Sequence, residues 1–181
     1  MNLPNKITIL RVILIPFFVI SILIREIPYN NYIAGVIFCL ACITDALDGH
    51  IARKYQLITN FGKFMDPLAD KLLVCAALIC FVSMPELNFP AWVAIVIISR
   101  EFAISGFRLV ASDNGVVIAA SKWGKFKTIA QMVMSILLIF NFDLVIFDYM
   151  EQIFIYLSMA LTVISLVDYI YKNRAVLKEE K

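Results

Sequence analysis

Residues 45–70 read DALDGHIARKYQLITNFGKFMDPLAD, and this stretch places four aspartates in a chain that is otherwise rich in apolar residues. At about 100° per residue, Asp48 lies within roughly 80° of Asp45 around a helix. Asp66 and Asp70 are one helical turn apart and share a face of a second helix. Apolar runs lead into the first pair and away from the second, so we expect two helices whose acidic faces meet.

Four carboxylates at the ends of apolar helices repel one another, so they need protonation, basic partners or bound cations. Bound cations account for all four at once, which makes Asp45, Asp48, Asp66 and Asp70 the expected metal ligands. Hard oxygen ligands suit Mg²⁺ or Mn²⁺, and two such ions can neutralise a diphosphate while orienting the attacking and leaving oxygens. The alternative is an interhelical polar network without metal.

Small residues accompany the first acidic pair. Gly49 and Ala52 leave that helix face without bulk, which would let a large phosphorylated ligand approach the backbone, and Arg53 can pair with a phosphate. The same small residues would also permit close helix packing.

The composition points to a membrane as the solvent. Hydrophobic residues make up 62% of the 181 residues and charged residues 17%, whereas soluble domains are roughly 45–50% apolar. Since a crossing needs about 20 apolar residues, we expect a single all-α integral membrane domain over residues 1–181 with six transmembrane helices. The apolar runs are Ile7–Ile24, Tyr32–Thr44, Leu72–Met84, Pro90–Val110, Lys127–Phe140 and Gln152–Tyr171.

The basic residues are distributed unevenly between the connections. Polar breaks fall at Ile27–Asn31, Pro85–Phe89 and Asn141–Glu151, and around these breaks Arg25 is the only Lys or Arg. The positive-inside rule therefore puts both termini in the cytoplasm and the aspartates at the cytoplasmic membrane interface. The formal net charge of +2 is too small to indicate nucleic acid as a partner.

The pattern D-x-x-D-G-x-x-A-R, eight residues, then G-x-x-x-D-x-x-x-D, resembles without departure the signature of the CDP-alcohol phosphotransferase family. The resemblance implies an enzyme in which an alcohol displaces CMP from a CDP-linked lipid. It implies Asp45, Asp48 and Asp66 as metal ligands and Asp70 as the general base. Adjacent cations would hold the Asp70 carboxylate in its ionised form, which makes it a poor base. Two other roles for Asp70 therefore stay open: it could only bind metal, or it could orient the attacking hydroxyl.

The N-terminal segment resembles the start of bacterial phosphatidylglycerophosphate synthases within that family, in which this region lies beside the nucleotide site. The likeness continues through residues 99–102, Arg108 and residues 122–127. It implies a homodimer in the bacterial cell membrane. The expected CDP-lipid-binding residues are Asn5, Thr8, Arg11, Gly49, Ala52, Arg53 and Gly62.

A second set of basic residues follows the aspartates in the chain. Arg108, Lys122, Lys125 and Lys127 can act as positive-inside determinants or as contacts to anionic lipids. Together they favour an acceptor that carries its own phosphate. The expected reaction is therefore transfer of the phosphatidyl group from CDP-diacylglycerol to sn-glycerol 3-phosphate. Arg100 and Glu101, adjacent in an apolar run, are expected to form a structural ion pair.

Three alternatives stay open. The same transfer could use another acceptor, such as inositol phosphate or serine. A prenyltransferase also uses paired aspartate motifs, but those normally lie far apart and lack the Gly-x-x-Ala-Arg element. A cation transporter would use the carboxylates as an ion pathway.

Overall fold

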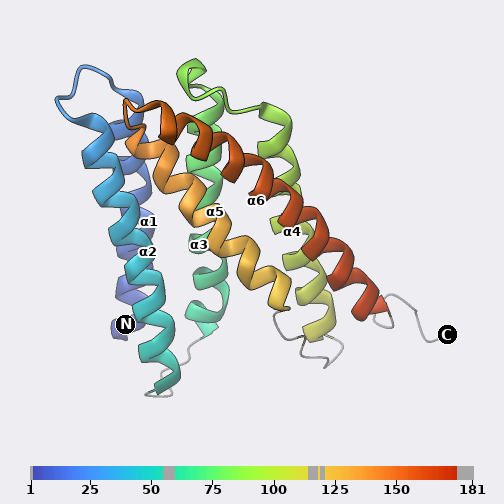
Figure 1. The fold of residues 1–181 in the computed structure, drawn as a ribbon. Coiled ribbons are helices and arrows are strands. Elements are labelled where there is room, and N and C mark those ends of the chain that lie inside the picture. Colours follow the sequence, from blue (N-terminus) through green and yellow to red (C-terminus); the bar gives the residue numbers. More distant parts are fainter. Residues whose placement is uncertain (1, 55–59, 114–117, 119–120, 175–181) are drawn as a thin grey trace. The chain divides into compact units, whose positions relative to one another are not determined.

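The structure is a computed structural model that describes residues 2–54, 60–113, 118 and 121–174. Throughout these residues the regular elements are helices, and no strand is present, which confirms the predicted all-α class (Figure 1). The α-helices are α1 (Leu3–Leu23), α2 (Asn30–Lys54), α3 (Asn60–Val82), α4 (Ala91–Asp113), α5 (Lys122–Phe140) and α6 (Val145–Lys172), with a short 3-10 turn at Pro85–Leu87.

Each predicted break contains one residue in the left-handed region of backbone space. Tyr29 has a φ of 57°, Asn88 of 47° and Asn141 of 41°. Asparagine tolerates this conformation better than most residues because its short amide can bond to the nearby backbone. Each of the three connections, residues 24–29, 83–90 and 141–144, therefore contains a backbone conformation that an α-helix does not use.

Two helix starts differ from the prediction. α5 begins at Lys122, before the predicted Lys127, because the Ser121 hydroxyl caps it by accepting a hydrogen bond of 3.1 Å from the Gly124 N–H. α6 begins at Val145, so the predicted break to Glu151 was too long. Asp148 lies in the first turn of α6, where a negative charge complements the helix dipole, and Glu151 is buried.

Three of the described helices are long and apolar enough to cross a membrane: Asn5–Leu23, Lys122–Phe140 and Val145–Lys172. Asn30–Asp45 and Lys71–Val82 are shorter apolar helical segments. α2 and α3 continue beyond these segments into the aspartate motif, as predicted. α4 carries Arg100, Glu101 and Arg108 along its length.

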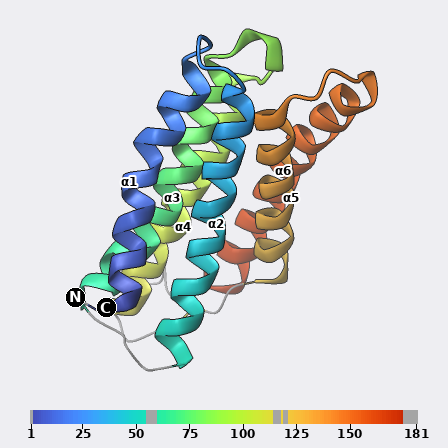
Figure 2. The same cartoon turned by 90° about the vertical axis from the view of Figure 1, so that its left-hand side faces the viewer.

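The chain folds into two compact units. The first consists of residues 1–85 and 139–141, and here α1 packs against α2 and α3 (Figures 1 and 2). Phe18 of α1 and Phe38 of α2 are buried, with their ring centroids 5.7 Å apart. Ala34, Ala41 and Ala77 are fully buried, and such small residues let membrane helices approach closely.

The second unit consists of residues 86–138 and 142–181, and here α4 packs along α6. Phe107 meets Tyr169 edge to face at 5.5 Å. The buried side of α6 includes three small hydroxyl residues, Ser158, Thr162 and Ser165. Thr162 and Ser165 donate to the carbonyls of Ser158 and Thr162 at 2.6 and 2.9 Å, which satisfies them within the helix.

Candidate metal and phosphate-binding site

The aspartate motif lies at one end of the first unit. α2 ends at Lys54 and α3 begins at Asn60, and the short connection between them allows these two points to be at most about 20 Å apart. The N-terminal end of α1 lies at the same end of the unit in both views (Figures 1 and 2). Three helix ends therefore lie at the same end of the unit, where the sequence predicts the metal site.

An ion pair joins two of the predicted site residues. Arg11 Nη1 of α1 lies 2.6 Å from Asp45 Oδ1 of α2. The side chain of Arg11 is 0% exposed, while that of Asp45 is 42% exposed. The guanidinium therefore fixes the carboxylate from the protein side, and the carboxylate remains open to a ligand on its other side.

Asn5 and Thr8 lie on the same helix as Arg11, and all three are buried. Burial of three polar side chains near the start of one apolar helix requires polar surroundings, because an unsatisfied polar group in an apolar interior is costly. The sequence placed these residues only loosely on one side of the helix. The structure shows that this side faces the interior of the unit.

The remaining signature residues lie in α2 and α3, but their side chains are outside what the structure describes: Asp48, Gly49, Ala52, Arg53, Gly62, Asp66 and Asp70. Among the side chains that are described, no three of His, Cys, Asp or Glu come together as a metal site. The donor set still fits a hard cation. Carboxylate oxygens are the ligands that Mg²⁺ and Mn²⁺ prefer, and Asp45 is exposed enough to reach one.

The predicted acceptor-phosphate residues lie in the second unit. Arg108 of α4 and Lys122 and Lys125 of α5 are exposed. Arg108 Nη2 lies 3.5 Å from the carbonyl oxygen of Ile118, in the connection that precedes α5. Lys122 and Lys125 are on neighbouring turns and point about 60° apart around the helix.

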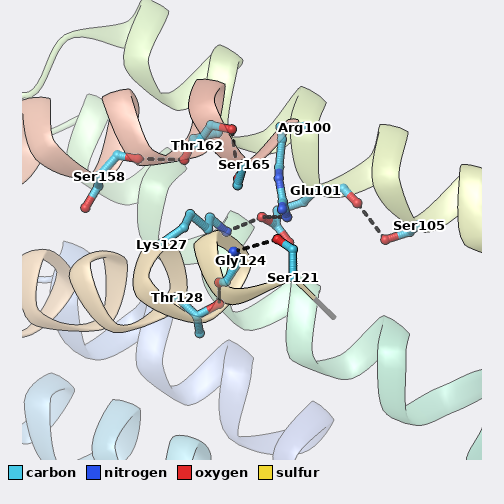
Figure 3. A network of polar contacts seen from close by, with 10 residues as sticks. All are labelled: Arg100, Glu101, Ser105, Ser121, Gly124, Lys127, Thr128, Ser158, Thr162 and Ser165. Carbon is cyan, nitrogen blue, oxygen red and sulfur yellow. Dashed lines mark hydrogen bonds and ion pairs between the residues drawn. The ribbon is translucent and has the colours of Figure 1, made fainter. Parts of the chain in front are cut away.

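Lys127 has different surroundings from the other three. It is buried, and its ammonium binds the carboxylate of Glu101 on α4 (Figure 3). Arg100 Nη1 contacts the same Glu101 oxygen at 3.3 Å, which confirms the predicted Arg100–Glu101 pair. One carboxylate therefore binds two cations from two helices.

The Lys127–Glu101 pair was not predicted from the sequence, because the partners are 26 positions apart and no local spacing connects them. The helical periodicity of α5 did contain a signal. Lys127 is rotated by about 140–160° from Lys122 and Lys125, so it lies on the opposite face of the helix.

Comparisons with known proteins agree with the signature. The family model described as CDP-alcohol phosphatidyltransferase matches residues 1–164, a range that spans both units. The chain is 46% identical to a Bacillus subtilis CDP-diacylglycerol–glycerol-3-phosphate 3-phosphatidyltransferase, with 98% of this chain and 97% of that protein covered. It is 41% identical to a Haemophilus influenzae protein of the same name, with 93% and 91% covered. The chain therefore belongs to the CDP-alcohol phosphatidyltransferase family.

Proposed function

We propose that this protein transfers the phosphatidyl group of CDP-diacylglycerol to the 1-hydroxyl of sn-glycerol 3-phosphate, giving phosphatidylglycerol phosphate and CMP. The observation that carries the proposal is similarity over nearly the whole chain to bacterial proteins named for this reaction, at 46% and 41% identity. The unbroken aspartate signature at residues 45–70 supports it.

The proposed chemistry is a direct displacement at phosphorus. The acceptor hydroxyl oxygen attacks the phosphorus that bears diacylglycerol, and the bond from that phosphorus to the bridging oxygen of CMP breaks. CMP leaves with the bonding electrons, and the hydroxyl proton passes to Asp70, which we also propose as a metal ligand. When bound, two Mg²⁺ or Mn²⁺ ions would neutralise the diphosphate and the charge that develops on it.

We propose a separate role for each group of residues around that step. Asp45, Asp48 and Asp66 would hold the ions with Asp70, and Arg11 would position Asp45 through the 2.6 Å ion pair. The CDP-lipid would be bound by the remaining predicted residues, Asn5, Thr8, Gly49, Ala52, Arg53 and Gly62, with Arg11 beside them.

The acceptor brings a phosphate of its own, and a cationic surface would bind it. Arg108 and Lys125 are the proposed contacts, with Lys122 one turn away. All three side chains are exposed, as an acceptor that enters from water requires. A neutral acceptor such as serine would not need this surface.

The proposed setting is the bacterial cell membrane, with six spans, both termini in the cytoplasm and the metal site at the cytoplasmic interface. The lipid tails would stay between helices while the water-soluble acceptor reaches the site from the cytoplasm. We further propose a homodimer.

A panel of acceptors tests the reaction. Purified full-length protein in mixed micelles with CDP-diacylglycerol and Mg²⁺ should give a higher kcat/KM with glycerol 3-phosphate than with inositol phosphate or serine. A preference for either of the other two would replace the proposed acceptor while retaining the chemistry. Metal flux in liposomes without CDP-lipid, abolished by Asp45→Asn, would instead support a transporter.

A further inference from the structure

Two polar contacts join α4 to the start of α5, and a third charged group of α4 lies near it. Arg108 reaches the Ile118 carbonyl before α5 begins, and Glu101 binds Lys127 in the second turn. Between them, Arg100 lies beside the first turn, since a Cβ added to Gly124 would be 3.8 Å from Arg100 Nη2. Charged groups therefore connect α4 to the first turns of α5, and Figure 3 shows Arg100, Glu101 and Lys127 among them.

Glu101 is the central group of this attachment. The side chains of Lys127, Arg100 and Glu101 are only 4%, 11% and 16% exposed. Two nearly buried cations would repel each other without the carboxylate between them. The Ser105 hydroxyl donates to the backbone carbonyl of Glu101 at 2.6 Å, so this hydroxyl has a hydrogen-bond partner within α4.

The two faces of α5 carry lysines with different surroundings. Lys127 faces α4 and is held there, while Lys122 and Lys125 are on the exposed face, about 140–160° away. A single phosphate cannot contact Lys125 and also the ammonium that Glu101 holds on the opposite side of the helix. Lys127 therefore influences where Lys122 and Lys125 lie by holding their helix in place.

We propose that Glu101 is a positioning residue for the acceptor: by binding Lys127 and Arg100 together, it fixes the first turns of α5 so that Lys122 and Lys125 bind the acceptor phosphate. This inference rests on the proposed function. It also changes the role expected for Lys127, from a phosphate contact to the anchor of its helix.

Steady-state kinetics with both substrates varied tests the proposal on the full-length enzyme. Glu101→Gln and Lys127→Met should each raise the KM for glycerol 3-phosphate about tenfold, because misplaced binding groups lose their contacts. The KM for CDP-diacylglycerol should stay within about twofold. Asp143→Asn, an exposed acid in the turn before α6, is the matched control and should change neither value.

Charge exchange separates positioning from direct contact. The double variant Glu101→Lys with Lys127→Glu should return the KM for glycerol 3-phosphate to within about threefold of the unmodified enzyme, since the pair is restored in reverse. An apolar triad, Arg100→Met, Glu101→Met and Lys127→Met, should do the same if the exchanged pair does not fold, because a buried group of paired charges can often be replaced by packed apolar residues and no buried cation is left without its carboxylate.

Two results would overturn the inference. If the folded double or triple variant keeps a high KM for glycerol 3-phosphate and a normal one for CDP-diacylglycerol, the Lys127 ammonium contacts the phosphate itself. If Glu101→Gln changes both KM values equally, or lowers only the melting temperature, the pair is merely structural. Failure of the unmodified enzyme to use glycerol 3-phosphate would refute the proposed function. That outcome differs from both results above, because each of them requires an unmodified enzyme that is active with glycerol 3-phosphate.

Discussion

Arg11 and Asp45 are unequally buried, and this inequality indicates how the pair works. The guanidinium is wholly inside the protein, whereas the carboxylate is 42% exposed, at the point where α2 continues into the aspartate motif. The four aspartates could be identified from the sequence because their spacing is local. The pairing of Arg11 with Asp45 could not, because it depends on how α1 packs against α2.

Replacing Arg11, which is proposed to position Asp45, should weaken binding of Mg²⁺. Arg11→Met should lower activity by about 10–100-fold and raise the Mg²⁺ concentration for half-maximal rate, because groups that orient metal ligands are worth that much. Arg11→Lys keeps the charge and should recover part of the loss. A Mg²⁺ titration of CMP release measures both. An unchanged Mg²⁺ requirement with a raised KM for CDP-lipid would place Arg11 on the substrate instead.

Replacing a proposed metal ligand should reduce activity more than replacing Arg11 does. Asp45→Asn, Asp48→Asn and Asp66→Asn should each reduce CMP release by at least about 100-fold, since metal ions supply several kcal/mol of charge stabilisation and each 1.36 kcal/mol is tenfold in rate. Asp143→Asn is the control. Near-normal turnover in any of the three aspartate variants, at saturating Mg²⁺, would remove that residue from the metal site.

At the scale of the helices, the sequence predicted the breaks between α1 and α2, α3 and α4, and α5 and α6, and it predicted that α2 and α3 extend into the aspartate motif. It misplaced the starts of α5 and α6 because polar residues there were taken as breaks. Ser121 is a helix cap, and Asp148 is favourable in a first turn. The Lys127–Glu101 contact was also missed, since it joins two helices.

The end of α5 packs closely on α2, and one glycine permits this. A Cβ at Gly35 would lie 2.5 Å from Phe140 Cζ, and the Phe140 ring also meets Tyr32 edge to face at 5.7 Å. Gly35→Ala should therefore destabilise the protein by about 1–3 kcal/mol, as overpacking of a filled interior does.

Thermal unfolding in detergent measures this effect. Gly35→Ala combined with Phe140→Leu should recover most of the lost stability, because the smaller side chain makes room for the methyl group. The control is Gly106→Ala, where nothing lies within 4 Å of the added Cβ. Equal melting temperatures for Gly35→Ala and Gly106→Ala would show that the close contact is not a constraint.

For the whole molecule, composition and charge asymmetry predicted a membrane protein, and three described helices have the length and apolarity for a crossing. α2, α3 and α4 each include charged residues, which shorten their apolar segments. Six crossings therefore stay a prediction.

The proposed topology can be tested by labelling introduced cysteines with a membrane-impermeant maleimide. With the four native cysteines replaced by alanine, Tyr29→Cys should react in intact cells, because the turn between α1 and α2 is proposed to face outward. Arg174→Cys should react only in inverted vesicles. Both positions are exposed. Labelling of both from the same side would contradict the proposed topology, which requires an odd number of crossings between them.

The most direct test of the proposed reaction follows the acceptor into the lipid product. Purified protein is supplied with CDP-diacylglycerol, Mg²⁺ and glycerol 3-phosphate labelled with ³²P, and lipid-extractable label and free CMP are measured together. We expect that both appear in equal amounts, that neither forms with EDTA, and that Asp45→Asn abolishes both. CMP release without labelled lipid, or labelled lipid that forms equally well with EDTA or in Asp45→Asn, would contradict the proposed reaction.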